Sequence, residues 1–195
     1  MASIVLAGVG GQGVITVANL IGRAAVIDGK NVLMTELHGM AQRGGRILVE
    51  LRIGNYKSPI IPEGRADVLL GFEELEAARN IHKLSENGIL LVNRRRIHPV
   101  PRIVKVMEYP EEPLVQLERR GAVFIEADSI ALQLGNKKVV NTIMAGSLFS
   151  TGMLPLSEDS LKDAIREVFG KYSDINMRAF EEGRRTLPAL QQRPV

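Results

Sequence analysis

The chain of 195 residues contains no cysteine and no tryptophan, and aromatic residues make up only 4% of it. Without thiolates it cannot form disulfides, zinc–thiolate sites or cysteine-ligated iron–sulfur clusters. The lack of cysteine also fits a reducing compartment, so we expect a cytoplasmic protein. The few aromatic side chains provide little surface for base stacking, which argues against a nucleic-acid partner.

Long apolar runs are absent as well. The most apolar stretch, residues 14–27, is interrupted by Asn19, Gly22 and Arg23 and falls short of the roughly 18 residues that a membrane span requires. Met1 leads directly into the strand-like residues 3–7 without a basic region, so we expect no secretory leader. The sequence therefore predicts neither a membrane anchor nor a membrane partner.

Charge of either sign is spread along the chain, with 25 basic and 22 acidic side chains and a formal net charge of +3. The basic runs at 94–96, 119–120 and 184–185 are separated by acidic runs at 73–74 and 111–112. This distribution favours an anionic small molecule or an acidic protein partner over a nucleic acid.

The hydrophobic pattern predicts one α/β domain over residues 1–195, with a frayed tail from about residue 188. Strands are predicted at 4–7, 31–36, 46–53, 66–71, 89–93, 102–107 and 122–127. Helices are predicted at 12–28, 72–84, 111–120, 137–152, 157–169 and 174–186. The first strand, turn and helix form a Rossmann-like unit.

The connection between the second and third predicted strands is informative. Residues 37–45 are too few for a parallel crossover, which needs a dozen or more residues and usually a helix. We therefore expect strands 31–36 and 46–53 to be antiparallel and the sheet to be mixed. A dinucleotide-binding half would have a helix at this place.

A glycine-rich turn, Gly8-Val9-Gly10-Gly11-Gln12-Gly13, joins the first strand to the first helix. Its backbone amides could face an anion or cofactor at the helix N-terminus, or its glycines could simply let the helix pack closely on the sheet. Gly8, Gly10 and Gly13 also fit the dinucleotide fingerprint, with Glu36 near the place of a ribose-binding acid. An NAD-dependent dehydrogenase is therefore an alternative, although the missing second helix weakens it.

A second group of functional residue types lies at 36–45, between two predicted strands. His38 and Arg43 are the catalytic candidates, because imidazole transfers protons and guanidinium pairs with carboxylate or phosphate. Gln42, Gly44 and Gly45 are added to the cofactor-contacting candidates. The alternative is a turn with incidental polar residues.

The remaining titratable residues give weaker signals. His82 and His98 have no paired ligand nearby, and no metal-ligand spacing or nucleophile–base–acid pattern is present. Glu73 and Glu76 are interpreted as helix caps or solvated helix positions, and Asp128 as the cap of the helix that follows it. We expect no metal site.

Several motifs in a fixed order are similar to one known family. They are residues 8–13, 38–45, 58–64, 66–68, 72–73, 76–77, 135–136, 141–146 and 176–183. Together they resemble the gamma-type component of 2-oxoacid:ferredoxin oxidoreductases, and most closely the beta subunits of indolepyruvate ferredoxin oxidoreductases. The resemblance covers nearly the whole chain.

The resemblance implies a three-layer α/β/α fold with a mixed, mostly parallel sheet, and a reaction shared with partner chains. In that reaction a 2-oxoacid, such as pyruvate, another 2-ketoacid or indolepyruvate, is decarboxylated to an acyl-coenzyme A while ferredoxin is reduced. Thiamine diphosphate, magnesium and 4Fe–4S clusters are then expected in partner subunits, with coenzyme A as co-substrate. This chain would hold no cluster, would be inactive alone and would complete the site through residues 8–13 and 38–45. A third possibility is a structural or regulatory binding subunit without site residues.

Overall fold

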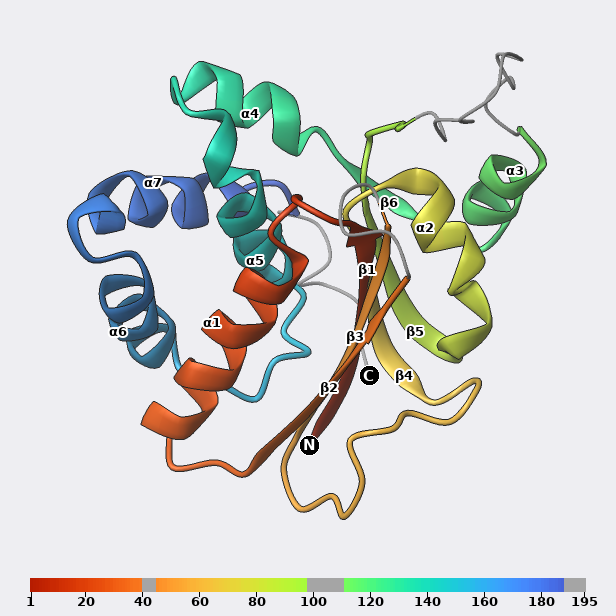
Figure 1. Cartoon of the computed structure of the whole chain (residues 1–195), viewed down its shortest axis with the longest axis horizontal. Coiled ribbons are helices and arrows are strands. Elements are labelled where there is room, and N and C mark those ends of the chain that lie inside the picture. The colour runs from red at the N-terminus through yellow and green to blue at the C-terminus, as the bar shows by residue number, and fades with distance from the viewer. Residues whose placement is uncertain (40–44, 98–110, 188–195) are drawn as a thin grey trace.

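The computed structural model describes residues 1–39, 45–97 and 111–187 (Figure 1). The strands are β1 (Ala2–Val9), β2 (Val32–His38), β3 (Arg46–Ile53), β4 (Ala66–Gly71), β5 (Leu84–Asn93) and β6 (Val123–Ile125). The α-helices are α1 (Val14–Ile27), α2 (Glu74–Arg79), α3 (Glu112–Arg119), α4 (Ala127–Gln133), α5 (Val140–Ser150), α6 (Glu158–Phe169) and α7 (Ser173–Arg184). Three 3-10 helices are η1 (Ile81–Lys83), η2 (Lys137–Val139) and η3 (Gly170–Tyr172). The strand predicted at 102–107 and the tail from 188 lie outside the described residues.

The sheet is mixed, with the strand order β2-β3-β1-β4-β5-β6. β3 runs antiparallel to both of its neighbours, β2 and β1, while β1, β4, β5 and β6 pair in parallel. The antiparallel pairing of β2 and β3 confirms the prediction from the short connection. It also places β3 between β1 and β2, which are adjacent in a dinucleotide-binding half.

Helices cover both faces of the sheet, so the predicted three-layer fold is confirmed (Figure 1). Because neighbouring side chains of a strand point to opposite faces, Ile4 and Leu6 of β1 belong to one core and Val5 and Ala7 to the other. The larger core lies against α1 and α4–α7, and the smaller one against α2 and α3.

Helices α5 and α7 touch through their backbones in the larger core. A Cβ on Gly146 would lie 2.1 Å from the carbonyl oxygen of Phe180, and one on Gly183 would lie 2.0 Å from that of Ile143. No side chain fits at either position, so these glycines set the distance between the two helices. All residues of α5 except Phe149 are buried.

Two element predictions need correction. The helix predicted to reach residue 84 ends at Arg79, and β5 starts at Leu84, five residues earlier than predicted. The extra strand residues contain an irregular register in which a Cβ on Gly88 would lie 2.8 Å from the carbonyl oxygen of Ala66. Glycine therefore permits a close approach here that hydrophobic periodicity does not reveal.

Acidic side chains of α2 also differ from expectation. Glu73 does cap α2, accepting a hydrogen bond from the Glu76 amide at 2.9 Å. Glu73, Glu74 and Glu76 are all buried, so the interpretation of a solvated position was wrong for Glu76. Asp128 is not the cap of α4 either, because Glu126 occupies the N-cap position.

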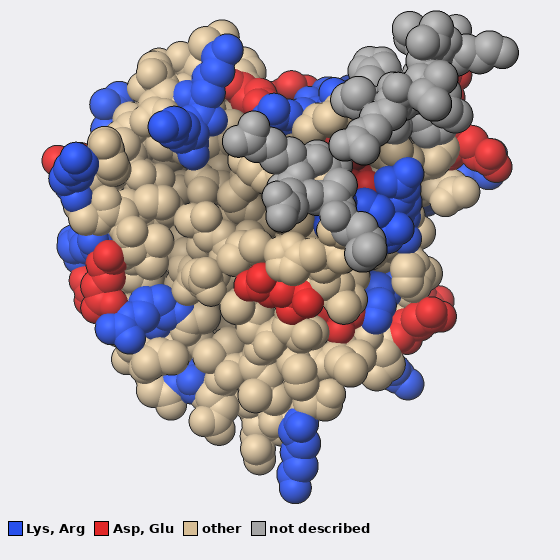
Figure 2. All heavy atoms as spheres, viewed as in Figure 1, with Lys and Arg blue, Asp and Glu red and all other residues tan. Residues whose placement is uncertain are grey.

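Basic and acidic side chains are interspersed on the surface. On the face shown in Figure 2, both signs occur side by side around the rim and no broad single-sign field is visible. In the described residues no helix is long and apolar enough to cross a membrane.

Candidate functional site

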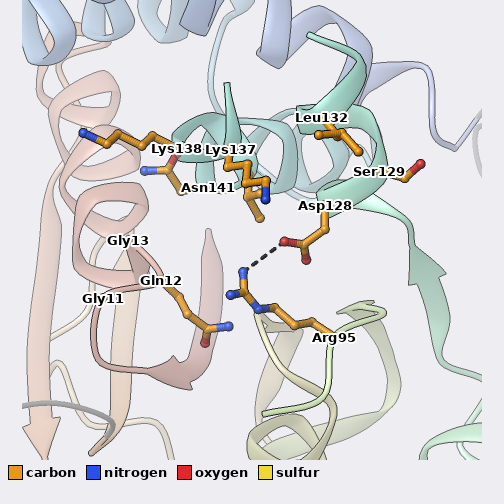
Figure 3. Close-up of a pocket in the computed structure, with 11 residues that line it drawn as sticks. Gly11, Gln12, Gly13, Arg95, Asp128, Ser129, Leu132, Lys137, Lys138 and Asn141 are labelled. Carbon is orange, nitrogen blue, oxygen red and sulfur yellow. Dashed lines mark hydrogen bonds and ion pairs between the residues drawn. The ribbon is translucent and has the colours of Figure 1, made fainter. Parts of the chain in front are cut away.

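A cavity of about 670 Å³ opens at the carboxyl ends of the parallel strands (Figure 3). β1 and β4 are neighbours there, but α1 follows β1 on one face of the sheet and α2 follows β4 on the other (Figure 1). Open α/β sheets bind ligands at such a switch point. The cavity is lined by Gly11, Gln12, Gly13, Arg95, Asp128, Ser129, Leu132, Lys137, Lys138, Val140 and Asn141.

The glycine-rich turn is held in place by the side chain of Gln12. Its Oε1 accepts a hydrogen bond from the Val9 amide at 2.7 Å, and its Nε2 donates to the Phe72 carbonyl oxygen at 3.0 Å. Both ends of the amide are therefore engaged in joining the turn to the end of β4. Gln12, a candidate cofactor contact, fixes the shape of the cavity wall.

The glycines of this turn differ in their surroundings. A Cβ on Gly8 would lie 2.7 Å from Cγ2 of Val14, and one on Gly13 would lie 2.7 Å from Nδ2 of Asn141. Gly11 has φ 96° and Gly13 has φ 80°, but a Cβ on Gly11 would meet nothing within 4 Å. Close packing thus explains Gly8 and Gly13, whereas Gly11 faces open space in the cavity.

A chain of hydrogen bonds extends from this turn to Asp128 and Arg95, which also line the cavity. The Phe72 carbonyl oxygen, which accepts from Gln12, is also 3.5 Å from Nδ2 of the buried Asn93. Asn93 Nδ2 donates to Oδ2 of Asp128 at 2.8 Å, and its Oδ1 accepts from the Ala127 amide at 3.2 Å. Asp128 in turn accepts from Arg95 at 3.0 Å. The ends of β1, β4 and β5 and the start of α4 are therefore linked by one polar network.

The cavity has an excess of positive charge. Arg95, Lys137 and Lys138 line it together with a single carboxylate, Asp128. Among the described residues neither lysine has an acidic partner within ion-pair distance. Lys137 points toward the Arg95–Asp128 pair, and Lys138 extends away from it (Figure 3). The cavity is thus suited to an anion.

The N-terminus of α1 adds to this character. Its N-cap residue is Gly13, and no side chain caps the helix. The first amides of a helix need outside partners, and the helix dipole favours negative charge there. The glycine-rich turn and the cations beside it can therefore act on the same ligand.

The second predicted loop returns to the same edge of the sheet. The Gly10 amide donates to the Gly45 carbonyl oxygen at 2.9 Å, which joins the two loops directly. His38 lies 3.1 Å, Nε2 to Oε2, from Glu36 and lines a separate cavity of about 240 Å³. His38 and the glycine-rich turn thus share an edge but not a cavity. Gln42, Arg43 and Gly44 lie outside the described residues.

Glu76 lies in the wall of the smaller cavity beside His38. Its carboxylate pairs with Arg79 and lies 3.4 Å from Nε of Arg46. Burial raises the pKa of Glu76 in spite of these two cations. The burial of Glu76 was missed at the sequence level because it depends on distant elements.

Arg95, Lys137, Lys138 and Asn141 were also missed. A usable signal existed for Arg95, because it is the second residue after a predicted strand, where ligand-binding loops begin. In the described ranges, no group of three or more His, Asp or Glu side chains could hold a metal ion.

Comparison with known proteins decides between the alternatives. The family model described as pyruvate ferredoxin/flavodoxin oxidoreductase matches residues 3–186. The chain belongs to this family. It is 41% identical to indolepyruvate oxidoreductase subunit IorB of Thermococcus kodakarensis, over 93% of each chain. Its homologues are subunits of 2-oxoacid:ferredoxin oxidoreductases, which confirms the resemblance, and nothing in these comparisons supports an NAD-dependent dehydrogenase.

Solved structures of the family share the fold. The gamma subunit of a keto/oxoacid ferredoxin oxidoreductase from Geobacter sulfurreducens superposes with a TM-score of 0.71 at 22% identity, covering 95% of this chain and 98% of that one. The 2-oxoglutarate:ferredoxin oxidoreductase of Magnetococcus marinus, with 2-oxoglutarate, coenzyme A and succinyl-CoA bound, gives 0.72 at 20% identity. The match covers 99% of this chain and 31% of that longer one.

Proposed function

We propose that this chain is the subunit of a cytoplasmic arylpyruvate:ferredoxin oxidoreductase that completes an active centre formed mainly by partner subunits. The partners carry thiamine diphosphate, magnesium and 4Fe–4S clusters, and coenzyme A is the co-substrate. The full-length similarity to IorB supports the choice of arylpyruvate. The absence of cysteine supports the division of labour, because this chain has no ligands for clusters.

The cationic cavity at the switch point is the observation that carries the proposal. Coenzyme A is rich in phosphate, and the cavity offers Arg95, Lys137 and the uncapped N-terminus of α1. Asp128 holds the Arg95 guanidinium in place. The cofactor-contacting residues of the turn are then Gly11 and Gly13 through their backbone, while Gly8 and Gln12 maintain its shape and Gly10 joins it to Gly45.

The loop of residues 38–45 forms the second part of the proposed wall. His38 and Arg43 line a cleft whose other side is the partner, with Arg43 contributing a positive charge near an anionic substrate or cofactor. Gly44 and Gly45 allow close approach of that ligand, and Gln42 offers it a side-chain amide. The hydrogen bond between Gly10 and Gly45 supports a common surface for the two loops.

Reconstitution tests the proposal. The chain is mixed with a thiamine- and cluster-bearing partner, and coenzyme A-dependent reduction of a viologen dye is followed with indolepyruvate. Charge-assisted bonds contribute about 1.5–3 kcal/mol each, so Arg43→Ala should lower kcat/KM by roughly ten- to a hundredfold. Arg43→Lys should restore part of the loss, because lysine cannot pair bidentately. Arg166→Ala, on the exposed side of α6, is the matched control.

Three outcomes would contradict the proposal. Full turnover by the partner alone would show that this chain is dispensable. Full activity of the Arg43→Ala complex with a lowered melting temperature would assign Arg43 to structure and favour a binding subunit without site residues. Micromolar NAD binding to the chain, lost on Gly10→Val, would restore the dehydrogenase alternative.

A further inference from the structure

The smaller cavity, of about 240 Å³, lies between the paired ends of β2 and β3 and helix α2. Its lining consists of Leu37, His38, Gly39, Arg46, Ile47, Leu48, Glu76 and Asn80. Leu37 and Leu48 are partners across the two strands, so their side chains lie next to each other on one face of the sheet. The strands therefore supply an apolar surface, and α2 with its C-cap residue Asn80 supplies polar groups.

One carboxylate oxygen beside this cavity lacks a hydrogen-bond donor. Glu76 is buried, and its Oε1 accepts a hydrogen bond from Arg79. Its Oε2 is also buried and accepts no hydrogen bond within the described part of the chain, since Nε of Arg46 is 3.4 Å away. The comparable buried oxygen of Glu50, Oε1, lies 2.7 Å from the Lys83 ammonium. Buried polar atoms nearly always have a partner, so Oε2 of Glu76 is an acceptor that needs a donor.

The charges around this oxygen restrict the kind of donor. Arg46, Arg79 and the imidazole of His38 surround the site and disfavour a cationic ligand, while the Glu76 carboxylate disfavours an anionic group next to it. A neutral N–H or O–H donor on an apolar group avoids both conflicts. The apolar part of such a ligand contacts the paired leucines of β2 and β3.

Arg46 controls access to the oxygen. Its side chain is 60% exposed, so it can turn aside without disturbing the core, and its guanidinium can then lie over the face of an aromatic ring. The cavity is smaller than the roughly 300–1,000 Å³ of sites that enclose a whole drug-sized ligand. It therefore has room for one ring system that carries a single donor.

We infer that this cavity binds the aromatic ring of the 2-oxoacid substrate, with the indole N–H donating to Oε2 of Glu76. The identification of the ring with that of the substrate rests on the proposed function. A phenyl ring has no donor for this oxygen, whereas indole has one. Glu76 is thus a specificity residue, because a site built to bond a substrate N–H discriminates against the analogue that lacks it.

Glu76→Gln tests this role in the reconstituted complex, with indolepyruvate and phenylpyruvate as the two substrates. Arg79 remains a donor, so the glutamine oxygen should turn toward it and the glutamine NH2 toward the cavity. The substitution then replaces an acceptor by a donor with little change in size. It should lower kcat/KM for indolepyruvate about tenfold and leave that for phenylpyruvate unchanged.

Binding is tested without turnover by two-dimensional NMR titration of the full-length chain with indole and with benzofuran, which has an oxygen in place of the N–H. The wild type should bind indole about tenfold more tightly than benzofuran, and Glu76→Gln should remove this preference. Leu37→Ala should weaken both ligands alike. The control is Met34→Ala, an exposed position on the opposite face of β2, which should weaken neither. A circular dichroism melt checks the fold of each variant.

Three results would overturn the inference. The first is an unchanged kcat/KM for indolepyruvate in Glu76→Gln, and the second is an equal loss for both substrates, which would make Glu76 a structural residue. The third is a wild-type chain with no preference for indole over benzofuran. Each leaves the proposed function standing as long as the wild-type complex turns over. An inactive wild-type complex with Glu76-dependent indole binding would mean that the ring site holds and the proposed function fails.

Discussion

Alanine substitutions at Gly11 and Gly13 separate ligand approach from packing in the glycine-rich turn. Both residues have a positive φ, so each alanine bears a similar backbone strain of about 1–2 kcal/mol. Only Gly13 has a neighbour in the way, because its Cβ would lie 2.7 Å from Nδ2 of Asn141. Gly11 is thus a matched control for Gly13.

The steric contribution at Gly13 follows from how firmly Asn141 is held. Asn141 is buried and bonds through Oδ1 to the Thr142 amide at 2.8 Å, so it cannot swing away freely. Overpacking of this kind costs about 1–3 kcal/mol. Gly13→Ala should therefore lower the free energy of unfolding by about 2–5 kcal/mol, and Gly11→Ala by about 1–2 kcal/mol.

The KM for coenzyme A should change more in Gly11→Ala than in Gly13→Ala, the reverse of the order for stability. A Cβ on Gly11 stands in the open cavity, where it would block close approach of an anion to the backbone. Gly11→Ala should raise the KM for coenzyme A in the reconstituted complex by about tenfold, which corresponds to about 1.4 kcal/mol. Urea unfolding followed by far-ultraviolet circular dichroism measures stability, since the chain has no tryptophan.

The reasoning is refuted if Gly11→Ala destabilises the chain as much as Gly13→Ala does. An unchanged KM for coenzyme A in the Gly11→Ala complex would show that Gly11 serves only the positive-φ backbone conformation of the turn.

Three further predictions concern the core and its charges. Gly146→Ala should lower the free energy of unfolding by about 3 kcal/mol, because α5 and α7 must move apart. Gly22→Ala, which has open space around it in α1, should raise it by about 0.5–1 kcal/mol. Equal effects of the two variants in urea unfolding would contradict the close contact between α5 and α7. Asn93→Ala should lower the free energy of unfolding by about 2–4 kcal/mol, because it leaves buried polar groups without partners. A decrease of less than about 1 kcal/mol would argue against the hydrogen-bond network around Asn93. Burial raises the pKa of Glu76, while hydrogen bonding to Lys162 lowers that of Glu158. The free energy of unfolding of Glu76→Gln relative to the wild type should thus rise as the pH increases above about 4.5. The stabilisation that Glu158 provides, measured as the difference between the wild type and Glu158→Gln, should disappear as the pH falls below about 4.5. The same pH dependence of stability for Glu76→Gln and Glu158→Gln would refute this assignment.

Features that depend on local chain geometry could be predicted from the sequence. The antiparallel hairpin of β2 and β3 follows from a connection too short for a crossover. The turn at residues 8–13 was expected to need glycine, and three-dimensional packing now distinguishes Gly8 and Gly13 from Gly11. The family resemblance rested on motifs whose order and spacing are preserved along the whole chain.

Features that depend on distant partners could not be predicted. Asp128 was expected to cap α4, but its carboxylate bonds to Asn93 and Arg95 after β5 has been placed beside it. The anion-binding cavity combines Arg95 with Lys137 and Lys138, which no local pattern connects. The buried acids of α2 need cations from other segments, such as Arg46 for Glu76, and single-sequence periodicity contains no information on such pairs.

The hairpin of β2 and β3 has a consequence for how this family can diversify. The two strands stay in register up to the pair His38 and Ile47, and the Gly39 amide donates to the Arg46 carbonyl oxygen at 2.9 Å. The loop between them is thus anchored at both ends by strands whose pairing does not depend on its content. A change of length within residues 40–44 leaves the pairing of β2 with β3 intact. Changes in the length of this loop can therefore be accommodated without a shift in the register of the sheet.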